Sequence, residues 1–132
     1  MTPSMATARF APVPITHLRA FDRYFRTELY FGMNKPSGVE VTTDQWSKFL
    51  ADEVTPRFPD GLTVIDAAGQ FRSASGTIVK EKSRMIILLY HKRDRESASR
   101  KIDEIRAVYC KLFDQESVMR IDLRRSVEVS FE

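Results

Sequence analysis

The sequence predicts an α+β domain of the ferredoxin-like kind, a β-α-β-β-α-β sandwich in which one antiparallel sheet carries two helices on one face. After residue 26, two segments have the apolar spacing of amphipathic helices, and strand-like segments flank them in the order strand, helix, strand, strand, helix, strand. The most apolar segment, residues 85–90, falls in the third strand, which is central in this fold.

Length and composition fit one domain. With 132 residues and a hydrophobic content of 42%, the chain is long enough to bury most of its apolar surface. We expect residues 1–14 to form a flexible N-terminal arm, because they show no periodicity, and residues 15–132 to form a single domain. The formal net charge of +3 argues against broad attraction to nucleic acid or to an anionic membrane.

Cysteine usage and the N-terminus bear on location. The single cysteine, Cys110, rules out an intrachain disulfide and a metal cage built from several cysteines. The first residues lack the apolar run of a secretory signal, and no window approaches the ~20 apolar residues that cross a bilayer. We therefore expect a cytoplasmic protein with no membrane span.

The N-terminal part of the domain should contain a short helix and then the first strand. Residues 15–26 carry apolar side chains at roughly helical spacing, namely Ile15, Leu18, Phe21 and Phe25. Residues 27–33 alternate between apolar and mixed positions, which predicts a strand with Leu29, Phe31 and Met33 on one face.

The first long helix is predicted over residues 43–54. Thr42 is placed to be its N-cap, with Gln45 three residues later as the partner of a capping box. Pro56 ends it, because proline disfavours a helical conformation of the preceding residue and has no N–H to donate.

A hairpin should follow. Its first strand covers residues 62–72 with a bulge at residues 67–68, its turn covers residues 73–76, and its return strand ends in the apolar residues 85–90. Burial on both faces explains an apolar run without alternation.

The second helix begins near Asp94, a candidate N-cap, and the last strand is predicted over residues 118–123. The helix shows one apolar side, made of Ala98, Ile102, Ile105, Tyr109 and Leu112. Val127, Val129 and Phe131 suggest a further edge strand.

The sheet face without helices needs a cover. If the alternate apolar residues of the first and last strands, Met119 and Ile121 included, point at the helices, then Glu28, Tyr30, Arg120 and Asp122 lie on the free face. A central apolar stripe with charges at its margin is typical of an interface, so we expect a homo-oligomer, a dimer or higher, that pairs this face or uses the N-terminal segment. Alternatively, residues 127–132 or the N-terminal arm cover the face within one chain.

Recognisable catalytic or cofactor motifs are absent. Histidine occurs only as His17 and His91, which gives little support to a metal site or a catalytic triad, and no phosphate-binding or dinucleotide-binding glycine motif occurs. Residues 29–34 are faintly like one box of an RNA-recognition motif, but the companion box on residues 84–89 has no aromatic platform. We expect no metal, no cofactor and no nucleic-acid partner.

The segment 53–64 is the best candidate for a ligand site. Two prolines and a glycine rigidify a loop that carries Glu53, Arg57 and Asp60, a pattern that suits a clamp for a small anionic molecule. Residues on the hairpin complete the predicted polar pocket, namely Asp66, Gln70, Glu81 and Ser83. The alternative is an ordinary connection in which Arg57 pairs with a neighbouring carboxylate.

Four stretches make the sequence similar to a known family. They are residues 26–32 (RTELYFG), 55–64 (TPRFPDGLTV), 69–72 (GQFR) and 115–118 (QESV). On these stretches the chain resembles the bacterial family called domain of unknown function 3574, many of whose members are described as lipoproteins. The resemblance implies an envelope location for such relatives, but it supplies no activity and no site residues. The sequence shows no lipoprotein-like signal segment or N-terminal cysteine, so we do not expect an envelope location for this chain.

Three functions are compatible with these observations. The leading one is an oligomeric domain that binds a small anionic molecule near Arg57, Gln70 and Glu81. The second is an enzyme of the dimeric α+β barrel kind, which would use Glu28, Tyr30 and Arg120 in a cavity on the sheet face. The third is a structural protein that binds a partner through a flat, dry interface.

Overall fold

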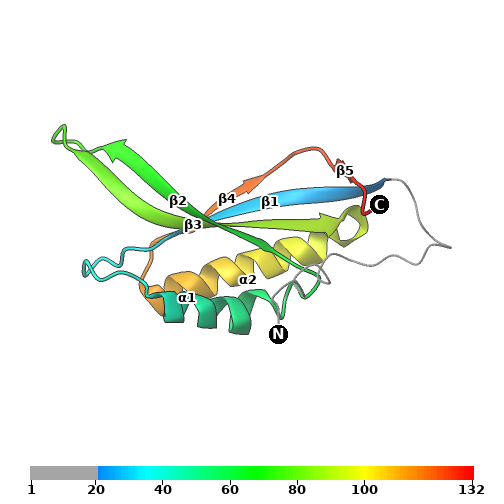
Figure 1. Cartoon of the computed structure of the whole chain (residues 1–132), viewed down its shortest axis with the longest axis horizontal. Helices are drawn as coiled ribbons and strands as arrows, with labels where there is room; N and C mark the ends of the chain where they lie inside the picture. The colour runs from blue at the N-terminus through cyan, green and yellow to red at the C-terminus, as the bar shows by residue number, and fades with distance from the viewer. Residues whose placement is uncertain (1–20) are drawn as a thin grey trace.

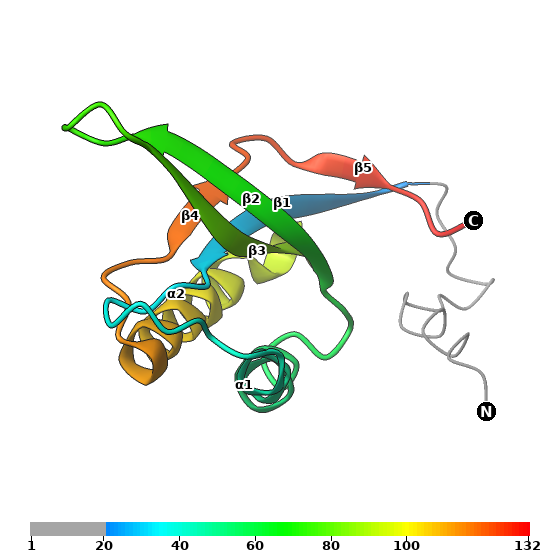
Figure 2. The ribbon, with the colours of Figure 1, turned by 60° about the vertical axis from the view of Figure 1, so that its left-hand side comes forward.

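The computed structural model describes residues 21–132, which form one five-stranded antiparallel sheet with both helices packed on the same face (Figure 1). Turning the view shows α1 and α2 side by side beneath the sheet, while no helix among residues 21–132 lies on its other face (Figure 2). The predicted arm, residues 1–14, and the predicted domain start at residue 15 lie outside the described residues.

The elements follow one another in the predicted order. They are β1 (Asp22–Gly32), α1 (Thr43–Phe49) with its π-helical continuation η3 (Leu50–Val54), β2 (Thr63–Arg72), β3 (Ile78–His91), the 3-10 turn η4 (Lys92–Asp94), α2 (Arg95–Phe113), β4 (Met119–Asp122) and β5 (Val127–Val129). Within residues 21–132, no helix is long and apolar enough to cross a membrane.

The order of strands confirms the ferredoxin-like prediction. It runs β2-β3-β1-β4, all antiparallel, so that β1 and β3 are central, and β5 pairs with the N-terminal part of β1. Strand β5 therefore extends the sheet at the edge that β4 also occupies. The hairpin of β2 and β3 projects beyond the helices (Figure 1).

Aromatic side chains from β1, α1 and α2 form the centre of the core. The ring of Phe31 lies 4.8 Å from that of Tyr109 and 5.2 Å from that of Trp46, between ring centroids, in edge-to-face geometry. Each such pair contributes about 0.5–1.5 kcal/mol beyond the burial of its area. The Tyr109 hydroxyl donates a hydrogen bond to the carbonyl of Gly32, so this buried hydroxyl is satisfied.

The start of α1 is as the sequence predicts. The hydroxyl of Thr42 accepts from the Gln45 N–H at 3.1 Å, and the Gln45 side chain accepts from the Thr42 N–H at 2.9 Å. The predicted helix over residues 43–54 is present as α1 and η3 together, and it ends before Pro56.

Two predictions about local structure are wrong. Residues 22–26 of the predicted helix 15–26 belong to β1, because Phe25 also fits the inward alternation of the strand that continues through Leu29; the part before residue 21 lies outside the described residues. The bulge at residues 67–68 does not form, since β2 and β3 pair without a break from Thr63 opposite Ile87 to Arg72 opposite Ile78.

Candidate functional site

A cavity of about 410 Å³ lies at the end of the sheet where β2 begins, β3 ends and α2 starts. Its walls come from the loop before β2, the last residues of β3, the first two turns of α2, and Tyr24 and Phe131. The volume falls within the range of small-molecule sites.

The cavity exists because β3 is longer than its partner at this end. The last pair between the two strands is Thr63 opposite Ile87, yet β3 continues to His91. The chain that precedes β2 turns away from β3 at Gly61, whose φ of 140° is open to glycine and rarely to other residues. The loop with two prolines, chosen from the sequence as the candidate clamp, therefore forms one wall of the cavity.

Aromatic and aliphatic groups make up the apolar part of the wall. Tyr24 packs edge-on against His91 at 5.5 Å and against Phe131 at 6.2 Å, measured between ring centroids. Ile87 and Leu89 line the cavity from β3. Such a surface favours a flat or apolar group on the ligand.

Charges of both signs surround this apolar surface. Arg93 and Lys101 line the cavity together with the carboxylates of Asp60 and Asp94. Burial raises the pKa of Tyr24, and the negative charges of Asp22, Asp60 and Asp94 raise it further while Arg93 lowers it. The Tyr24 hydroxyl therefore stays protonated at neutral pH and is a hydrogen-bond donor.

Arg57 is engaged by its own neighbours. Its Nε donates to Glu104 at 3.0 Å, and its Nη1 donates to the carboxylate of Glu53 at 3.1 Å and to the Glu53 carbonyl at 2.8 Å. The hydrogen bond to Glu104 is the main cause that raises the pKa of Arg57. This is the alternative foreseen from the sequence, in which the arginine ties the loop to the helices, although Arg57 also lines the cavity.

The other residues of the predicted polar pocket lie elsewhere. Because β2 and β3 pair without a bulge, Asp66 and Gln70 lie on one face of the hairpin, and Glu81 and Ser83 lie on the other. Asp66 pairs with Arg84 at 3.3 Å. The structure thus brings Arg57 and Glu53 together and does not bring these four residues to them.

Glu28 and Tyr30 lie on the free face of the sheet, as predicted. The Tyr30 hydroxyl donates to Glu28 at 2.9 Å, and that hydrogen bond raises the pKa of Tyr30. Arg26 donates to the other oxygen of Glu28 at 3.0 Å. The three side chains form a polar row along β1, beside the apolar side chains Met85, Ile87, Met119 and Ile121 of neighbouring strands.

The prediction that Arg120 and Asp122 lie on the free face is wrong. Arg120 pairs with Leu29, whose side chain points at the helices, so Arg120 does too, while Met119 and Ile121 face outwards. The prediction put the apolar residues of β4 on the helix side and its charged residues on the free face. The reverse holds because β4 is an edge strand that packs against polar residues of α2. Its inward positions hold charges that are satisfied by the helix.

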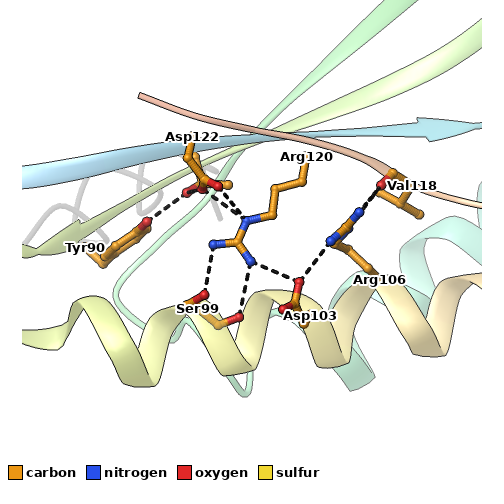
Figure 3. A network of polar contacts seen from close by, with 8 residues as sticks. Tyr90, Ser99, Asp103, Arg106, Val118, Arg120 and Asp122 are labelled. Atoms are coloured by element: carbon orange, nitrogen blue, oxygen red, sulfur yellow. Dashed lines mark hydrogen bonds and ion pairs between the residues drawn. The ribbon is translucent and has the colours of Figure 1, made fainter. Parts of the chain in front are cut away.

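Arg120 is the centre of a polar network between β4 and α2 (Figure 3). It donates to Asp122 at 2.9 Å, to the Ser99 hydroxyl at 3.0 Å and to Asp103 at 2.9 Å. Arg106 extends the network from Asp103 to the carbonyl of Val118. This arrangement fastens the edge strand to the helix and leaves Arg120 unavailable to a cavity on the sheet face.

Sequence reasoning missed most of the cavity. Tyr24, Leu89 and His91 line it, yet none was a candidate. The sequence gives one signal for this cavity, a difference in strand length. The apolar strand β3 continues to His91, whereas β2 begins only at Thr63, after Gly61. Among residues 21–132, no group of three or more histidine, cysteine, aspartate or glutamate side chains is placed to hold a metal ion.

Comparison with known proteins gives a family and a fold. Residues 26–131 match the model of a family described as protein of unknown function (DUF3574). The chain is similar to a phage SAM lyase in complex with S-methyl-5′-thioadenosine, at 18% identity and a TM-score of 0.58, over 89% of this chain and 96% of that chain. It is also similar to a phage SAM lyase in the apo state, at 17% identity and a TM-score of 0.53, over 92% of this chain and 98% of that chain. No curated protein sequence matches. At these identities the similarity shows a shared fold.

Proposed function

We propose that this chain, which belongs to the family described as protein of unknown function (DUF3574), binds a small molecule in the cavity where β2 begins and β3 ends. Membership confirms the family resemblance found in the sequence. The observation that carries the proposal is the cavity itself, of about 410 Å³, with an apolar aromatic surface and charged groups at its margin.

The wall chemistry supports a ligand with a flat apolar part and a polar, charged part. Besides Arg57, two cations line the cavity, Arg93 and Lys101, together with two carboxylates, Asp60 and Asp94. This balance of charges favours a ligand with both an anionic and a cationic group, such as a zwitterion. Because Arg57 is engaged by Glu53 and Glu104, the anion should meet Arg93 or Lys101.

The structural neighbours suggest a first probe. A protein of the same fold is bound to S-methyl-5′-thioadenosine, a compound with a flat base and a thioether. S-methyl-5′-thioadenosine supplies the planar ring that the wall chemistry favours, and SAM adds to the same nucleoside the charged part, a zwitterionic amino acid.

The test is calorimetric titration of the protein with S-methyl-5′-thioadenosine and SAM, followed by a thermal-shift screen of anionic metabolites. The Ser97→Trp variant places a large ring at the cavity wall, and Arg100→Trp places the same ring on an exposed position of the same helix. We expect binding to be lost in Ser97→Trp and kept in Arg100→Trp. If no compound binds, or if both variants bind as the wild type does, the cavity is not the ligand site.

Catalysis is the second candidate function, because the similar structures are those of a lyase. Tyr24 and the carboxylates of Asp60 and Asp94 lie together at the cavity, and Tyr30 with Glu28 forms a second polar pair on the free face. Incubation with SAM and chromatographic detection of S-methyl-5′-thioadenosine tests for lyase activity. Absence of product at protein concentrations that saturate binding would leave a binding protein only.

We also propose that the free face of the sheet pairs with a second copy of the chain. Large apolar side chains on this face remain exposed, with Met119 at 53%, Leu89 at 42% and Ile121 at 40%. The row of Arg26, Glu28 and Tyr30 is internally paired, so two copies can approach without an unpaired charge between them. The alternative cover, the C-terminal segment, instead joins the sheet edge as β5.

A further inference from the structure

The direction of the backbone groups of β3 follows from two hydrogen bonds at its far end. The N–H of Met33 donates to the carbonyl of Lys82, so the even-numbered residues of β3 direct their N–H and C=O groups at β1. The N–H of Ser73 donates to the carbonyl of Thr77, so the odd-numbered residues direct theirs at β2. Leu89 and His91 therefore face the β2 side.

On that side, no strand of the described part of the chain pairs with Leu89 or His91. Continuing the register would place Gly61 opposite Leu89 and Pro59 opposite His91, but β2 begins only at Thr63. The Gly61 N–H donates instead to the carbonyl of Phe58 at 3.2 Å, within the loop. Among residues 21–132, no backbone group bonds to the Leu89 carbonyl or to the His91 N–H.

The same positions line the cavity. Leu89 and His91 form the β3 side of the cavity, and Pro59 and Gly61 form the loop side opposite them. Tyr24 and Phe131 add aromatic rings beside this edge. The cavity thus contains an acceptor, the Leu89 carbonyl, followed by a donor, the His91 N–H, in the spacing of an extended strand.

We infer that this backbone edge binds the edge of a 6-aminopurine. The inference rests on the proposed function, since it assigns the ligand class of the same cavity. In an extended strand the C=O of one residue and the N–H two residues later point to the same side. A ring that carries a donor next to an acceptor can therefore donate to the C=O and accept from the N–H. The exocyclic amine and the neighbouring ring nitrogen of a 6-aminopurine have that order, and a 6-oxopurine has the reverse.

A planar ring suits this edge better than an added peptide strand. Strand addition uses a row of main-chain hydrogen bonds along an exposed sheet edge. Here only two residues of β3 are unpaired, and the loop with Pro59 and Gly61 closes the opposite side of the cavity. Enzymes that extrude a nucleobase from a duplex recognise it in the same way, by hydrogen bonds to its edge and by contact with aromatic side chains.

The protein variant that tests the inference is His91→Pro, which removes the donor. The φ of His91 is −60°, which proline adopts without strain, and its N–H takes no part in the sheet. The side chain of His91 bonds to Asp22 and to the Arg93 N–H, so His91→Ala is the matched control that loses these contacts and keeps the N–H.

The His91 side chain is also part of the cavity wall, so the two variants are compared with each other. We expect His91→Pro to bind S-methyl-5′-thioadenosine at least about tenfold more weakly than His91→Ala, because a ring nitrogen is left without a donor. Circular dichroism and thermal unfolding compare the folding of the two variants. Equal affinity in the two variants would overturn the inference. If His91→Pro fails to fold, the ligand comparison that follows decides alone.

The ligand comparison uses the wild-type protein. S-methyl-5′-thioinosine differs from S-methyl-5′-thioadenosine only in the base edge, and we expect it to bind at least about tenfold more weakly. Equal binding of the two compounds would overturn the base-edge inference while leaving the cavity as the ligand site. Binding of neither compound, with binding of another metabolite that Ser97→Trp abolishes, would overturn the inference alone. Binding of nothing would overturn the proposed function as well.

Discussion

Thr27 shows how a single hydroxyl can matter to this fold. It is fully buried at the centre of β1, and it lies 2.8 Å from the Tyr90 hydroxyl and donates to Asp122 at 2.7 Å. Thr27→Val keeps the shape and leaves both partners without that bond, so we expect the free energy of unfolding to fall by about 1–3 kcal/mol. Urea denaturation measures it. Thr77→Val, in the exposed hairpin turn, is the control, and an equal effect of the two changes would contradict the role of the network.

Asp103 gives the network of Figure 3 a pH dependence. Burial alone would raise the pKa of Asp103, but the hydrogen bonds from Arg106 and Arg120 outweigh it and hold the pKa below its ordinary value of 3.8. A lowered folded-state pKa means that the ionised carboxylate stabilises the fold above the unfolded value and that this contribution is lost as the pH falls through the folded-state pKa.

We therefore expect Asp103→Asn to be less stable than the wild type at a pH of about 7, and the difference to shrink towards a pH of about 3. The measurement is urea denaturation of both proteins across this range. Asp44→Asn, at an exposed position in the first turn of α1, serves as the control. A difference that stays constant with pH would show that ionisation of Asp103 contributes nothing.

At the scale of elements, the capping box decides where α1 begins. Thr42→Ala removes the acceptor for the Gln45 N–H and should lower the free energy of unfolding by about 1 kcal/mol. Thr43→Ala, one residue later inside the helix, removes a similar side chain without a capping bond. Thermal unfolding distinguishes the two, and the prediction is wrong if Thr43→Ala is the more damaging.

The sequence predicts an element correctly where residues next to its ends determine where it begins and stops. It fails where contacts with another element of the fold determine the conformation or the buried face. The signals at Thr42, Gln45 and Pro56 lie within a few residues of the ends they set. The predicted faces of β4 are wrong because Arg120 is satisfied by Asp103 and Ser99 of α2, which lie 17 and 21 residues earlier and outside the alternation of the strand itself. The prediction of a helix is wrong at residues 22–26 because Phe21 and Phe25 are four residues apart, a spacing that fits one face of a helix and one face of a strand equally.

The candidate site divides in the same way. The loop that forms one wall was found because prolines and a glycine mark it locally. Leu89 and His91 could not be found from the sequence. Their backbone groups line the cavity because β2 starts at Thr63, opposite Ile87, and so does not reach them, and that starting point is set by the fold. A backbone acceptor and donor also leave no trace in residue type, since every residue but proline has both.

At the scale of the whole molecule, the free face is large enough to form a dimer. Strands β1, β2, β3 and β4 have 11, 10, 14 and 4 residues. At about 3.3 Å per residue and about 4.8 Å per strand, their face covers roughly 600 Å², and two such faces bury on the order of 1,000 Å². This is near the lower limit of specific interfaces. We therefore expect a dimer of moderate affinity whose stability depends on the apolar side chains of the face.

Ile121→Lys tests this dimer. Ile121 is exposed on the free face beside Glu28, whose two carboxylate oxygens already accept from Arg26 and Tyr30. An isologous interface would contain the new lysine twice, each desolvated without a free carboxylate partner. We expect the wild type to have about twice the chain mass of 15.2 kDa in light scattering at micromolar concentration, and Ile121→Lys to have the mass of one chain. The control is Ile78→Lys, which adds the same charge at an exposed isoleucine on the opposite face of the hairpin and should leave the dimer intact. A monomeric wild type, or a dimer that survives Ile121→Lys, would contradict pairing through this face, because a buried unpaired ammonium group opposes association far more strongly than the loss of one isoleucine contact.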